Sequence, residues 1–168
     1  MIQLNNKQKL YQSFKITNEG LLVNLDKIIS GMEKLFDYFI NDRTQSKIFS
    51  NREYMDIYTL CYDVCTKREN NDIMYTKIIY EIYQMGLLEY FSLIQIKLNN
   101  NYKNEAETIL SISKEWYNFQ IVSRWLTLFY RYLDRYYLTA NMLDDVKTNN
   151  TKKFYENLIQ PHLNEYFT

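Results

Sequence analysis

The sequence is poor in the residues that build turns, disulfides and catalytic sites. Its 168 residues contain only 3 Gly, 1 Pro, 2 Cys and 1 His. Turn-rich β architectures need many more Gly and Pro, so this scarcity predicts long helices with short connections. Two Cys make no disulfide framework. With one His, no Gly-rich phosphate loop and no Ser or Cys nucleophile beside a base, we expect no enzyme and no cofactor.

An excess of one charge and a long hydrophobic run are also missing. Lys+Arg and Asp+Glu number 20 each, whereas a nucleic-acid binder usually carries a basic excess. Met1–Phe14 has no apolar signal-peptide core, and the apolar stretch near Leu87–Ile96 is too short to span a bilayer. We therefore expect an intracellular protein, cytoplasmic or nuclear or both (in a host cell if it is viral). Nucleic acid and membrane are not expected as partners.

Apolar residues recur at spacings of three and four, which predicts an all-α bundle of about five to six helices. Residues 1–20 are expected to form a loosely ordered polar leader, and residues 21–168 one helical repeat. The expected helices are Leu21–Ile40, Ser50 or Asn51 to Lys67, Ile73–Leu98, Asn104–Trp116, Trp116–Met142, and one from near Lys152 that bends at Pro161. Arg68–Asp72 is expected to be a loop.

The second expected helix carries more apolar surface than a core requires. On a wheel at ~100° per residue its apolar arc covers roughly 220°, about twice what a surface helix needs. The arc has an aliphatic edge, formed by Ile57, Leu60, Cys61 and Val64. Beside it lies an aromatic edge, formed by Tyr54, Met55, Tyr58 and Tyr62. Aliphatic edges suit a core, and Met and Tyr suit a partly wet partner surface.

The fifth expected helix has the same excess. A core seam consists of Phe119, Val122, Leu126, Phe129, Leu133 and Tyr136. A second stripe consists of Ile121, Trp125, Leu128 and Tyr132. The wheels alone leave two readings open: both helices are buried all round, or both present a partner surface.

Three motifs resemble the amino-terminal region of cullins. The run Tyr54–Thr66, YMDIYTLCYDVCT, resembles the cullin pattern "Y-M-x-L-Y-T-x-x-Y-x-x-C-T". The segment opening at Trp116 and closing with YLDR at Tyr132–Arg135 resembles the cullin segment that ends "Y-L/M-D/N-R". The third motif resembles "W-x-x-L-x-x-G-I-x-x-V", with Leu25 in place of Trp, and its matching residues are Leu25, Ile28, Gly31, Met32 and Leu35.

The resemblance implies the first of the stacked five-helix repeats of a cullin, which binds an adaptor through its second and fifth helices. It implies docking by Tyr54, Met55, Tyr58 and Tyr62 on the second helix and by Tyr132, Trp125 and Leu128 on the fifth. The implied partner is a Skp-family adaptor with an F-box receptor, and an elongin-type or BTB adaptor is the weaker alternative. The expected function is an adaptor-binding module of a cullin–RING ubiquitin ligase scaffold.

The sequence ends after this one repeat, so we expect a truncated cullin-like protein or a fragment. The carboxy-terminal region that would bind a RING protein is not in it, and no RING partner is expected. Such a chain could compete with a full-length cullin for the adaptor. The alternative is a structural helical domain that binds another partner, or itself, through the same aromatic face.

The other constellations favour ordinary structural roles. Cys61 and Cys65 lie one helical turn apart, but structural zinc needs four ligands and His162 is far away in sequence, so no metal site is expected. Asp144 and Asp145 suit a solvated loop better than a catalytic pair. The basic residues of the fifth helix share one polar stripe and are expected to be solvated; they are Arg124, Arg131 and Arg135.

Overall fold

The computed structural model describes residues 6–42, 47–66, 75–101 and 104–166, and within them all regular structure is helical, as the sequence predicts. The helices are α1 (Lys7–Ser13), α2 (Glu19–Ile40), α3 (Asn51–Thr66), α4 (Tyr75–Asn101), α5 (Glu105–Phe129), α6 (Val146–Phe154) and α7 (Gln160–Tyr166). Two π-helical segments, η1 (Leu133–Leu138) and η2 (Tyr155–Ile159), follow α5 and α6. The expected loop at Arg68–Asp72 lies outside the described residues.

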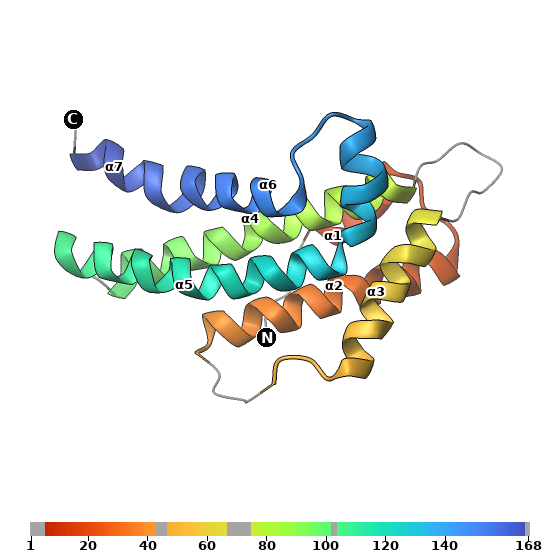
Figure 1. Cartoon of the computed structure of the whole chain (residues 1–168), viewed down its shortest axis with the longest axis horizontal. Coiled ribbons are helices and arrows are strands. Elements are labelled where there is room, and N and C mark those ends of the chain that lie inside the picture. Colours follow the sequence, from red (N-terminus) through yellow and green to blue (C-terminus); the bar gives the residue numbers. More distant parts are fainter. Residues whose placement is uncertain (1–5, 43–46, 67–74, 102–103, 167–168) are drawn as a thin grey trace.

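The helices form a bundle with α4 at its centre (Figure 1). In Figure 1, α2, α4, α5 and the α6–α7 rod run side by side, while α3 crosses one end of the bundle. Contacts join α4 to α2, α3, α5, α6 and both π segments. Its buried side chains lie on nearly all sides, and they include Ile78, Ile79, Ile82, Tyr83, Leu87, Tyr90, Phe91 and Ile94. A helix surrounded in this way must be apolar around most of its circumference.

Local signals in the sequence fix where α2 and α3 begin. Asn18 caps α2, because its side-chain oxygen accepts a hydrogen bond from the backbone N–H of Leu21 at 3.0 Å. Ser50 and Glu53 form a reciprocal capping box at α3: the Glu53 N–H donates to the Ser50 hydroxyl oxygen, and the Ser50 N–H donates to the Glu53 carboxylate. The sequence left Ser50 and Asn51 as alternative caps, and the structure selects Ser50.

Two glycines allow α2 to approach its neighbours closely. A Cβ added to Gly31 would lie 2.6 Å from Cδ1 of Ile57 on α3. One added to Gly86 on α4 would lie 2.2 Å from Cε of Met32. Real Cβ atoms do not tolerate such distances, so the absence of a side chain at Gly31 sets how near α3 packs to α2.

The structure corrects the expected fourth and fifth helices. No break occurs at Trp116; α5 runs without interruption from Glu105 to Phe129, and Tyr130 ends it. The chain then turns sharply upward in Figure 1 and continues through η1. The uninterrupted helix follows from the absence of Gly and Pro between residues 105 and 129.

The last helix begins earlier than expected, at Val146 rather than near Lys152. Asp145 caps it by accepting a hydrogen bond from the Thr148 N–H at 2.7 Å. The Asp134 carboxylate accepts from the Val146 N–H at 2.7 Å, which ties η1 to the start of α6. Burial raises the pKa of Asp134 above its ordinary value.

A buried polar network then fixes α6 against α4 and α5. The Tyr83 hydroxyl donates to the Asn150 side-chain oxygen at 2.6 Å, and the Asn150 amide donates to the Ser123 hydroxyl at 2.9 Å. Asn150 is fully buried, so these bonds replace the water it loses on folding. The position of α6 beside α5 is therefore specified by hydrogen bonds as well as by apolar packing.

The expected disturbance at Pro161 takes the form of a π segment. Pro161 has no N–H and cannot donate to the carbonyl four residues earlier, which belongs to Asn157. That carbonyl instead accepts a hydrogen bond from Nε2 of Gln95 on α4 at 2.6 Å. The π segment η2 ends just before Pro161. The rod from α6 to α7 thus continues past the proline with an additional anchor on α4.

The leader expected over residues 1–20 contains a short helix, α1. Tyr11 is buried there, and its hydroxyl donates to Asp26 at 3.0 Å. Lys7 pairs with the same carboxylate at 3.0 Å. The described part of the leader is therefore attached to α2. None of the described helices combines the length and the apolar character needed to cross a membrane.

Candidate functional site: an aromatic surface across α3 and the end of α5

The two apolar edges of α3 meet different surroundings. The aliphatic edge faces the bundle, where Ile57, Cys61 and Val64 are buried. The aromatic edge is more open: Met55 is 50% exposed, Tyr62 is 39% exposed, and Tyr54 and Tyr58 are half-buried. This division agrees with the helical wheel and leaves an apolar strip of α3 in contact with solvent.

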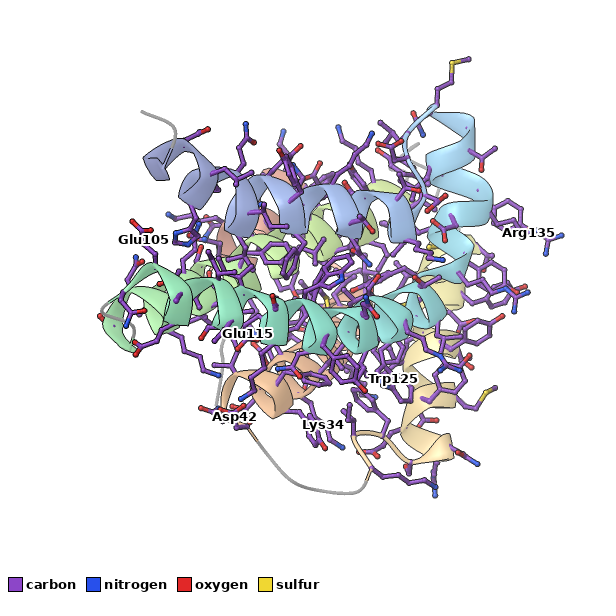
Figure 2. All side chains as sticks on the ribbon, turned by 60° about the vertical axis from the view of Figure 1, so that its left-hand side comes forward. Lys34, Asp42, Glu105, Glu115, Trp125 and Arg135 are labelled. Atoms are coloured by element: carbon purple, nitrogen blue, oxygen red, sulfur yellow. The ribbon has the colours of Figure 1, made fainter. Side chains whose placement is uncertain are left out.

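The aromatic edge of α3 meets aromatic side chains of α5 and of the segment that follows it. The ring of Tyr54 lies 6.1 Å from Trp125 and 6.1 Å from Tyr58, measured between centroids. Tyr132 lies 5.6 Å from Tyr58 and 4.4 Å from Tyr62. Trp125 lies on the side of α5 that faces α3 (Figure 2). These five rings form one connected cluster. We call the five rings and Met55 together the aromatic face.

Phe49 and Phe129 form the base beneath this face. Both are buried, and their rings lie 5.2 Å apart. Trp125 packs against Phe49 at 5.0 Å and against Phe129 at 5.8 Å. The Lys34 ammonium lies over the Phe49 ring, 5.2 Å from its centroid. The partly exposed rings therefore rest on a rigid base, which limits the conformational entropy they would lose on binding a partner.

The structure extends the aromatic face to a residue assigned above to the core. Tyr136 was expected in the core seam, but it is 51% exposed and stacks on Tyr132 at 5.9 Å with an interplanar angle of 9°. The π segment places one more residue in each turn, so Tyr137 takes the buried position. The Arg135 guanidinium lies 5.6 Å from the Tyr136 ring, and Figure 2 shows the Arg135 side chain pointing away from the bundle.

One expected docking residue is not part of the ring cluster. Leu128 is half-buried and lines a groove between α5 and α6, together with Arg124 and Lys147. It lies about 60° around α5 from Trp125, because successive residues rotate by ~100°. The structure thus brings six of the seven expected docking residues to the α3 side and leaves Leu128 on the neighbouring side of α5.

Hydroxyl groups give the aromatic face its polar character. A side-chain hydrogen bond with Tyr58 raises the pKa of Tyr132 above its ordinary value. At the amino-terminal end of α3, a hydrogen bond from Lys34 and those from Ser50 lower the pKa of Glu53 to about 2. The face therefore offers apolar area, hydroxyl donors and acceptors, and a paired charge at one border, which is the composition of a protein interface.

The cysteines of α3 lie behind this face. Burial raises the pKa of Cys61 well above its ordinary value and that of Cys65 to about 12. These two thiols, one helical turn apart, could supply only two of the four ligands of a structural zinc site. Across the described residues, no group of three or more His, Cys, Asp or Glu side chains is placed to hold a metal ion.

Comparison with known proteins identifies the family. The family model of the Cullin alpha solenoid domain matches residues 30–168, which include α3, α5 and the whole aromatic face. The chain therefore belongs to the cullin family. No solved structure gives a significant match.

The curated relatives are plant proteins. "Cullin-1" of Oryza sativa subsp. japonica is 33% identical over 96 residues, covering 56% of this chain and 12% of that protein. "Putative cullin-like protein 1" of Arabidopsis thaliana is 26% identical over 112 residues, covering 67% of this chain and 15% of that protein. "Putative cullin-like protein 2" of the same plant is 27% identical over 109 residues, covering 65% of this chain and 27% of that protein. The chain thus spans a small part of each relative's length.

Proposed function

We propose that this chain is an adaptor-docking module of a cullin-type scaffold and has no catalytic role of its own. Membership of the cullin family implies an adaptor as partner, and the motif of α3 favours a Skp-family adaptor that carries an F-box receptor. The aromatic face is the proposed docking surface. The observation that carries the proposal is the row of partly exposed rings joining α3 to the segment after α5, at residues that match the family motifs.

The energetics of such a face fit a docking role. Interfaces are rich in Tyr, Trp and Met at their centres, and a few of these residues account for most of the binding free energy. Met55 is half exposed and can adapt its shape to a partner. Tyr58 and Tyr132 already contact each other, so little rotamer freedom remains to be lost on binding.

Calorimetric titration with a purified Skp-family adaptor bound to an F-box fragment tests this proposal. We expect saturable binding by the chain and its loss in the double variant Tyr54→Ala with Tyr58→Ala. The matched control is Tyr117→Ala with Tyr155→Ala, which removes two exposed tyrosines outside the aromatic face and should bind normally. Elongin-type and BTB adaptors are titrated in parallel. If none of the adaptors binds and the chain self-associates through the same residues, the alternative of a structural interaction domain is correct.

We further propose that the chain by itself competes with a full-length cullin for the adaptor. All the proposed docking residues lie within this chain, so the degree of competition depends on its concentration relative to its dissociation constant. Expression in cells whose adaptor it binds should raise the levels of F-box substrates and reduce their ubiquitination, and extra adaptor should reverse the effect. Equal accumulation with the double variant would contradict this part of the proposal.

A further inference from the structure

A second concave surface lies on another side of α5. A groove of 540 Å³ runs between α5 and α6, and its lining includes Trp116, Phe119 and Leu128. The Trp116 ring packs against Phe154 of α6 with 4.8 Å between ring centroids. The volume is within the range of known ligand pockets, ~300–1,000 Å³, and the aromatic lining supplies apolar area that a guest can bury.

Two cations border this groove from opposite walls. Arg124 comes from α5 and Lys147 from α6, and both are exposed. Neither forms an ion pair with a described residue, whereas nearby Lys152 and Lys153 pair with Asp144 and Glu156. The lining of the groove contains no acidic side chain. An anionic guest would therefore meet two cations whose charge no described residue neutralises.

From this combination we infer that the α5–α6 groove binds a short acidic segment of a partner protein. An apolar side chain of that segment, such as leucine or phenylalanine, enters the groove and packs against its apolar lining. Flanking carboxylates pair with Arg124 and Lys147. A peptide suits the groove better than nucleic acid, because the groove offers apolar lining and the chain has zero formal net charge.

This site is separate from the aromatic face. Trp116 and Trp125 are nine positions apart on α5, which at ~100° per residue places them on opposite sides of the helix. Trp125 packs toward Phe49 and Tyr54, whereas Trp116 packs toward Phe154. The chain contains 2 Trp, so each surface has its own indole reporter. Binding in the groove and docking on the aromatic face can therefore be measured independently in the same sample.

The test is a titration of the ¹⁵N-labelled chain, following the two indole N–H signals. The probe is a synthetic eight-residue peptide with one leucine and one phenylalanine surrounded by glutamates. We expect a saturable shift of the Trp116 signal, with the Trp125 signal unchanged. Arg124→Glu with Lys147→Glu should weaken binding at least about tenfold, since reversal turns two attractions into repulsions. Raising the salt concentration should weaken binding by the wild type.

Matched controls separate the groove from general electrostatics. Lys27→Glu with Lys77→Glu changes the net charge by the same amount at exposed positions outside the groove, and it should retain binding within about twofold. Thr151→Trp fills the groove without altering charge, so it should abolish binding even if the charge-reversed variant fails to fold.

Four results would overturn the inference. The first is no saturable shift of Trp116 at millimolar peptide. The second is equal binding of a peptide whose glutamates are replaced by lysines. The third is equal weakening by the groove and control charge reversals. The fourth is a single-stranded RNA oligonucleotide that moves the Trp116 signal at lower concentration than the peptide, which would assign the groove to nucleic acid.

Discussion

Tyr58 and Leu126 should separate binding from stability, because one lies on the aromatic face and the other in the core. Leu126 is fully buried, with a relative solvent exposure of 0%. Its truncation to Ala removes buried methyl groups and leaves a cavity, which typically costs about 2–5 kcal/mol. For a chain of this length, ~2–4 °C of melting temperature accompanies each kcal/mol. At a cost of about 3 kcal/mol, Leu126→Ala should therefore melt roughly 6–12 °C lower.

Tyr58→Ala should behave in the opposite way. The Tyr58 ring is half-buried and contacts Tyr54 and Tyr132, so its loss removes ring contacts worth about 0.5–1.5 kcal/mol without opening the core. At ~2–4 °C per kcal/mol the melting temperature should fall by about 1–6 °C, and the helical circular-dichroism signal should stay. If the ring is central to docking, its truncation costs ~2 kcal/mol of binding, or about a thirtyfold increase in the dissociation constant of the adaptor.

Two measurements on three variants decide this prediction. Melting is followed by circular dichroism, and adaptor binding by calorimetry below the lowest melting temperature. The control is Tyr117→Ala, since Tyr117 is 69% exposed and lies outside the ring cluster, and it should change neither quantity appreciably. If Leu126→Ala weakened binding more than Tyr58→Ala and melted at the wild-type temperature, the assignment of Leu126 to the core and of Tyr58 to the docking surface would be wrong.

Three further perturbations probe the features that hold the bundle together. Asn150→Ala should lower the free energy of unfolding by about 1–3 kcal/mol, because it removes the 2.6 Å acceptor of the buried Tyr83 hydroxyl, leaves that hydroxyl only the Val146 carbonyl at 3.3 Å, and opens a small cavity; a urea midpoint within error of wild type would contradict this. Lys97→Met should lower the free energy of unfolding by about 2–3 kcal/mol at neutral pH, since it removes the cation that lies 3.4 Å from the buried carboxylate of Glu115. A decrease of less than about 0.5 kcal/mol in urea unfolding would contradict this. Alkaline pH should destabilise the chain, because burial raises the pKa of Cys65 to about 12 and that of Tyr83 above its ordinary value, so the unfolded chain releases these protons first. Stability should be constant below about pH 8.5 and fall as pH rises toward about 12, by up to ~1.4 kcal/mol per pH unit for each group, and a flat urea midpoint between pH 8 and pH 11 would refute the linkage.

The spacing of apolar residues predicted the helical class and the positions of α2 and α3 well. Such spacing reports which side of a helix is buried, and the wheel of α3 separated Ile57 and Val64 from Met55 and Tyr62 as the structure does. The start of α3 was predicted to within one residue, with Ser50 and Asn51 as alternative caps, and the hydrogen bonds between Ser50 and Glu53 in the structure decide for Ser50. These features depend on residues close together in the chain, which is why sequence alone reveals them.

The register after Tyr130 was not predictable in the same way. A wheel assumes 3.6 residues per turn, and it therefore assigned Tyr136 to the core. The π segment changes the backbone hydrogen bonds from i→i+4 to i→i+5 and moves Tyr137 into that place. The start of α6 had a readable signal, since Asp145 before Val146 is a good cap, but the anchoring of Val146 by Asp134 depends on tertiary structure.

The close approach at Gly31 has a consequence for inherited variation in this protein. Gly31 is buried beneath α3, and a Cβ added there would lie 2.6 Å from Cδ1 and 3.1 Å from Cγ1 of Ile57, so Ile57 must shift and we expect α3 to move away from α2. Tyr58 and Tyr62 would move with it, away from Tyr132, which is carried by a different part of the chain. A genetic screen for lost adaptor binding should thus recover Gly31→Ala among changes on the surface, and Ile57→Val, which removes the colliding Cδ1 atom, should appear as its second-site suppressor.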